Sequence, residues 1–61
     1  MVTLWFKPGP SKLQTIDALK KAAHLSLREA KDAYELGRVT CDEADRELVM
    51  LAIEENGGTI E

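Results

Sequence analysis

The chain has 61 residues, a formal net charge of −3 and 44% hydrophobic residues, which is typical of one small globular domain. A domain of this length buries only about 60% of its unfolded surface, so its margin of stability is thin. A single cysteine, Cys41, excludes an intrachain disulfide, and with one histidine it argues against a metal cluster. We therefore expect no cofactor.

The sequence holds no apolar run near the roughly 20 residues of a membrane span and no signal-peptide pattern. We expect a cytoplasmic protein with no membrane partner, encoded as a complete short reading frame. Its charge is uneven, since residues 1–40 hold seven Lys/Arg against four acids and residues 41–61 hold one Arg against seven acids. This asymmetry predicts a basic and an acidic face, or simply a solvated surface.

The pattern of residues 2–6, VTLWF, predicts a strand. Its period of two places residues 2, 4 and 6 on one face, so Trp5 either packs at a sheet edge or lies exposed. The turn Pro8–Pro10 ends this strand.

Residues 12–35 predict two helices broken at residues 24–26. Ser11 lies three residues before Gln14 and Ser26 three before Glu29, and both spacings are typical of a capping box. Gly37 fits the left-handed residue after a helix, and residues 38–40 predict a short extended link or strand. The expected buried stripes are Leu13, Ile16, Leu19, Ala22 and Ala23, then Leu27, Ala30, Ala33 and Tyr34. Outside them we expect the ion pairs Asp17–Lys21, Arg28–Asp32 and Lys31–Glu35.

A third capping box, Thr40 to Glu43, predicts the start of the longest helix, with Cys41 in its first turn. Its apolar stripe is Ala44, Leu48, Leu51 and Ala52, widened by Val49, Met50 and Ile53. Residues 59–61 predict a terminal strand beside the first. Residues 1–61 thus form one α+β domain, a two-layer sandwich of order β-α-α-β-α-β with three helices on one face of a small, mainly antiparallel sheet.

No convincing catalytic set is present, and we expect no enzyme. His24 suits a helix C-terminus better than general-base chemistry, and Cys41 is best explained as a small residue at a helix start. The loop 7–12 precedes a helix but lacks the GxxxxGK[ST] phosphate-binding pattern.

The ordered motifs SKLQTIDALK (11–20), LREAKD (27–32) and the tail 53–61 resemble the C-terminal domain of the bacterial ribosomal stalk protein (L-seven/L-twelve). The resemblance implies the same β-α-α-β-α-β fold and a helical hairpin that docks translational GTPases such as elongation factors. Carried over residue by residue, it implies a partner-binding surface of Lys12, Leu13, Ile16, Asp17, Lys20, Ser26, Arg28, Glu29 and Lys31.

Two of these residues depart from the family pattern. Asp17 stands where the family has a lysine, and Ser26 stands where it has a glycine. The family's dimerising N-terminal domain and hinge have no counterpart here. We therefore expect a stand-alone protein-interaction module of the kind that a phage or mobile element encodes, either monomeric or weakly dimeric. The alternative is a small nucleic-acid-binding regulator that uses Lys12, Lys20, Lys21, Arg28 and Lys31.

Overall fold

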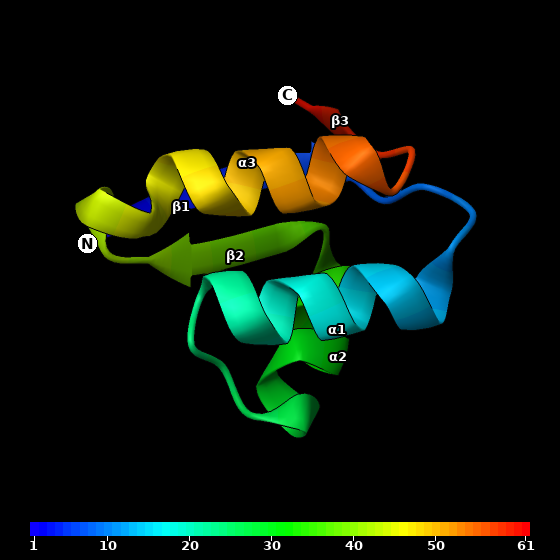
Figure 1. Cartoon of the computed structure of the whole chain (residues 1–61), viewed down its shortest axis with the longest axis horizontal. Helices are drawn as coiled ribbons and strands as arrows, with labels where there is room; N and C mark the ends of the chain where they lie inside the picture. Colours follow the sequence, from blue (N-terminus) through cyan, green and yellow to red (C-terminus); the bar gives the residue numbers. More distant parts are fainter.

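The computed structural model describes all 61 residues and confirms the predicted order of elements. They are β1 (Val2–Lys7), α1 (Lys12–Ala22), α2 (Leu27–Leu36), β2 (Arg38–Cys41), the 3₁₀ turn η1 (Glu43–Asp45), α3 (Arg46–Glu55) and β3 (Thr59–Ile60). Three helices and a three-stranded antiparallel sheet make an α+β fold (Figure 1). None of the helices has the length and apolar character needed to cross a bilayer.

The first strand is the centre of the sheet, whose order is β2-β1-β3. Trp5 pairs with Arg38 of β2, and Phe6 pairs with Ile60 of β3, as expected for a terminal strand beside the first. Leu4 and Phe6 are buried, while Trp5 on the opposite face is 53% exposed. The helices therefore cover one face of the sheet, and the other face is open.

The core lies between that covered face and the three helices. Each helix contributes small or aliphatic side chains, and α1·α2 and α1·α3 are the helix pairs in closest contact. The buried hydrophobic residues are Leu4, Phe6, Ile16, Leu19, Ala23, Ala30, Ala33, Val39, Cys41, Val49 and Ile53. Helix α1 thus lies between the other two helices.

One of the three predicted capping boxes is confirmed. The Glu29 amide donates to Ser26 Oγ and the Ser26 amide donates to Glu29 Oε1, each at 3.2 Å. The box predicted at Ser11 is wrong, because its side chain makes no cap hydrogen bond. There the backbone alone starts α1, with the Thr15 amide donating to the Ser11 carbonyl at 2.9 Å.

The box predicted at Thr40 is also wrong. Thr40 and Cys41 belong to β2, because a β-branched pair, Val39 and Thr40, aligns with β1 and completes the sheet. The following helix begins only at Arg46, after η1, and with ten residues it is shorter than the eleven-residue α1. Cys41 therefore does not lie at a helix start.

The predicted stripes were wrong at several positions. Five of their members are exposed: Leu13, Leu27, Ala44, Leu48 and Leu51. In α1 the buried Thr15 takes a core position instead, and in α3 the stripe is rotated onto Val49 and Ile53. An apolar helix surface that is wider than the core contact leaves the choice of the buried side to tertiary packing.

The end of β1 and the segment that follows it contact the ends of α2 and α3. The Tyr34 hydroxyl donates to the Gly9 carbonyl at 3.1 Å, and the Phe6 amide donates to the Gly37 carbonyl at 2.9 Å. Gly37 has the predicted left-handed conformation, with φ of 70°. Gly9 is buried, and a Cβ there would overlap the Asn56 carbonyl oxygen. This close approach fixes where α2 and α3 end relative to β1.

The two serine caps give a matched stability test. We expect Ser26→Ala to lower the free energy of unfolding by about 1 kcal/mol, because the hydrogen bond from the Glu29 amide to Ser26 Oγ is lost. For a domain of this size that is a fall in Tm of about 4–8 °C. Ser11→Ala is the control and should change Tm far less. Equal losses in thermal melts of the two variants would contradict the assignment of the caps.

Candidate protein-docking surface

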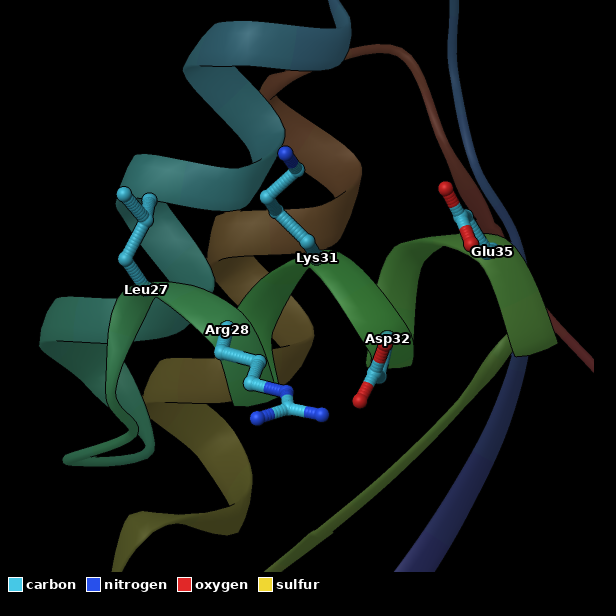
Figure 2. A pocket seen from close by; sticks show the side chains of 5 residues that line it. All are labelled: Leu27, Arg28, Lys31, Asp32 and Glu35. Atoms are coloured by element: carbon cyan, nitrogen blue, oxygen red, sulfur yellow. The ribbon is translucent and has the colours of Figure 1, made fainter.

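Helices α1 and α2 pack on one another at a steep angle and form a helical hairpin whose connection includes His24 (Figures 1 and 2). His24 adopts a left-handed conformation, with φ of 55°, and its Nε2 lies 3.6 Å from Asp45 Oδ2 at the start of α3. At the other end of the hairpin, the Lys12 ammonium lies 6.0 Å from the centroid of the Tyr34 ring. The turn of the hairpin therefore lies against the start of α3, and Lys12 of α1 lies over Tyr34 of α2 at the other end.

One exposed flank of α1 carries Leu13, Asp17 and Lys20. Their spacing of i, i+4 and i+7 places them on one side of the helix. Leu13 is 81% exposed, and Lys20 is also exposed. Asp17 forms the predicted ion pair with Lys21 at 3.0 Å, and both side chains are largely in solvent. Such an exposed pair contributes little to stability.

The facing flank of α2 carries Leu27 and Lys31. Figure 2 shows both side chains projecting to the side of α2 on which α1 lies, while Arg28 and Asp32 project away. Leu27 is 58% exposed. The five side chains Leu27, Arg28, Lys31, Asp32 and Glu35 line a shallow hollow on α2. The predicted pairs Arg28–Asp32 and Lys31–Glu35 are not formed within 4.0 Å, so these charges remain free to bind.

Three of the residues predicted to contact a partner have structural positions instead. Ile16 is only 3% exposed, so its side chain belongs to the core. Ser26 and Glu29 hold each other in the capping box, which occupies the hydroxyl and one carboxylate oxygen. They shape the start of α2 rather than presenting free groups.

Leu27 was not predicted to contact a partner, because a leucine at the start of an amphipathic helix is usually buried. Its spacing of four from Lys31 was the available signal, since it places the two on the same flank. We define the hairpin surface as Leu13, Asp17 and Lys20 of α1 with Leu27 and Lys31 of α2. Lys12 lies at its edge, over Tyr34.

The remaining reactive groups do not converge. Cys41 is buried at the end of β2. Burial raises the pKa of its thiol, and the nearby carboxylates of Asp45 and Asp42 raise it further. No group of three or more His, Cys, Asp and Glu side chains has a metal-binding arrangement.

Comparison of the chain with family models, with curated proteins and with solved structures gives no match. The likeness to the stalk domain therefore depends on the motifs of residues 11–20 and 27–32.

The position of Cys41 leads to a test of thiol reactivity. We expect a disulfide reagent at pH 8 to modify the folded protein at least tenfold more slowly than the urea-unfolded chain, because the thiol is buried and its pKa is raised. Folding favours the neutral thiol, so this contribution to stability is lost as pH rises above the pKa of the unfolded thiol. Equal rates of modification would contradict the buried position.

Proposed function

We propose that this chain is a non-enzymatic interaction module that binds a protein partner through the hairpin surface. The observation that carries the proposal is the pair of exposed leucines, Leu13 and Leu27, on neighbouring helices that also carry the exposed cations Lys20 and Lys31. Exposed apolar side chains within a polar rim are typical of protein-binding sites. The two helices already pack on one another and on the core, so the hairpin loses little conformational entropy on binding.

Burial of the two leucines can contribute a large part of the free energy of binding. Fully burying an exposed leucine is worth about 1.5–3 kcal/mol, so Leu13 and Leu27 together can supply much of a micromolar affinity. The cations around them add steering toward an acidic partner surface and accelerate association. The leucines therefore supply affinity and the cations supply orientation.

The resemblance to the stalk domain makes translational GTPases, such as elongation factors, the first partners to test. In that setting the chain acts in the cytoplasm as a modulator that captures a factor. Asp17 is the difference that matters, because it places a negative charge among the cations of the hairpin surface. Like charges across an interface cost several kcal/mol, so Asp17 selects against any partner that presents a carboxylate there.

A nucleic-acid partner is the weaker candidate for the same surface. Acidic side chains interrupt its cations, since Asp17 pairs with Lys21, and Asp32 and Glu35 border Lys31. A phosphate backbone is repelled by this mixture. Affinity for nucleic acid that falls steeply with salt would favour this alternative over a protein partner.

The hairpin surface can be tested by affinity capture from a bacterial lysate, followed by titration of the captured protein. We expect Leu13→Gln and Lys31→Glu each to weaken binding by about tenfold or more, because each removes an exposed contact of the hairpin surface. Leu36→Gln and Lys7→Glu are matched controls, since both residues are exposed but lie outside the surface. Full binding by both test variants would exclude the hairpin surface as the docking site.

The reversed charge gives a second test, with purified elongation factors. We expect Asp17→Lys to increase binding by about tenfold, because it restores the cation of the family pattern and removes a repulsion. Glu43→Lys is a control that makes the same change in net charge outside the surface. If Asp17→Lys gains no more than Glu43→Lys does, the partner is not a translational GTPase bound in the family's manner.

A further inference from the structure

The outer edge of β2 is not paired with another strand, since the sheet order is β2-β1-β3. In an antiparallel ladder, alternate residues of a strand direct their backbone groups to the partner strand. The Phe6 amide bonds to the Gly37 carbonyl across this ladder, so the N–H and C=O groups of Val39, two residues on, also point to β1. Those of Arg38 and Thr40 therefore point outward, where no other segment of the chain hydrogen-bonds to them.

A groove lies along this edge, between β2 and α2. Its lining includes Glu29, Asp32, Ala33, Leu36, Val39 and Thr40. Val39 is buried on the covered face of the sheet and Thr40 is exposed on the open face, so a hollow that touches both lies at the edge itself. Figure 2 shows Asp32 projecting from α2 on the side where β2 diverges from the helix. One wall of the groove is thus a strand edge with free backbone groups.

The other wall combines apolar and acidic side chains. Leu36 is 62% exposed and lines the groove together with Ala33. The Asp32 carboxylate is exposed and forms no ion pair. The cation of β2, Arg38, lies over the Trp5 ring on the open face, 5.4 Å from its centroid, and so leaves the charge of the groove uncompensated. The groove therefore favours an apolar side chain next to a basic one.

We propose that this edge binds an extended peptide segment with an apolar side chain and a lysine or arginine two residues apart. The segment adds antiparallel to β2, as in both existing strand pairs, and its backbone exchanges hydrogen bonds with Arg38 and Thr40. Because side chains alternate along a strand, the apolar and the basic side chain both enter the groove. Strand addition takes affinity from the backbone and specificity from these alternate side chains.

The complex is weak, because β2 has only four residues and small interfaces are transient. The groove shares no residue with the hairpin surface, and the inference does not depend on the function proposed for that surface.

Fluorescence polarisation with labelled peptides tests the strand addition without altering the protein. The probe is Lys-Thr-Val-Thr-Lys with both termini blocked, whose pattern places the valine and both lysines on one side of a strand. We expect saturable binding with a Kd of about 1 mM or less. Thr-Lys-Val-Lys-Thr has the same composition but its lysines lie opposite the valine, so it should bind about fivefold more weakly.

Methylation of the peptide backbone tests the hydrogen bonds to β2. When the valine of the probe enters the groove, the N–H groups of its two threonines face β2 and that of the valine faces solvent. N-methylation of both threonines should weaken binding by about fivefold or more. N-methylation of the valine alone is the matched control and should leave binding unchanged.

Variants of the protein test the groove wall. Asp32→Lys should weaken probe binding by about fivefold or more, because a carboxylate is lost. Glu35→Lys is its control, since Glu35 lies on the same helix but projects to the other side (Figure 2). Leu36→Gln should also weaken binding, whereas Leu48→Gln, at a leucine of similar exposure, should not. Leu13→Gln in the hairpin surface should bind the probe normally. Circular dichroism melts establish that each variant is folded.

The inference is overturned if the probe does not bind, if the peptide with methylated threonines binds as the probe does, or if Asp32→Lys and Glu35→Lys bind it equally. Self-association of the chain that displaces the probe would assign the edge to a second copy and overturns the inference as well. Leu13→Gln and Leu36→Gln separate the two sites, because the first impairs only the hairpin surface and the second only the groove.

Discussion

The structure depends on the close packing of one short segment, Phe6 to Gly9 at the end of β1, against the ends of α2 and α3. The Phe6 amide bonds to Gly37 at the end of α2, and the Gly9 carbonyl accepts from Tyr34. On the other side, Gly9 packs directly on the Asn56–Gly57 backbone that ends α3. One short segment therefore fixes the positions of α2 and α3. In a domain with only thirteen buried residues, these few contacts replace the larger core that a longer chain would have.

The sequence predicted the order of elements because each strand and helix has its own local signal. It also predicted the capping box at Ser26, the left-handed Gly37 and the ion pair Asp17–Lys21, all of which depend on neighbours within four residues. The boxes at Ser11 and Thr40 show the limit of such signals. The same spacing occurs at all three places, but Thr40 pairs with β1 in the sheet. At Ser11 the backbone is not in the extended conformation that Ser26 adopts, and its side chain makes no cap hydrogen bond.

The hairpin surface was harder to predict, since its leucines are ones that the sequence assigns to the core. Leu13 and Leu27, like the exposed Leu48 and Leu51 of α3, fit helical stripes as well as the residues that are actually buried. Which side of a helix faces inward is decided by the other elements. Here α1 lies between two neighbours and buries Thr15, Ile16 and Leu19 toward the sheet. The exposed leucines are therefore recognisable only once the packing is known.

Helix α1 has two exposed flanks, one beside α2 and one beside α3. Leu13 and Lys20 face the α2 side, whereas Ala18 and Ala22 face the α3 side. The Asp17–Lys21 pair lies on the ridge between them. Because Asp17 belongs to the hairpin surface, its pair with Lys21 offsets part of the negative charge that it presents there. Both side chains are largely in solvent, so a partner that offers Asp17 another cation can exchange the pair at little cost.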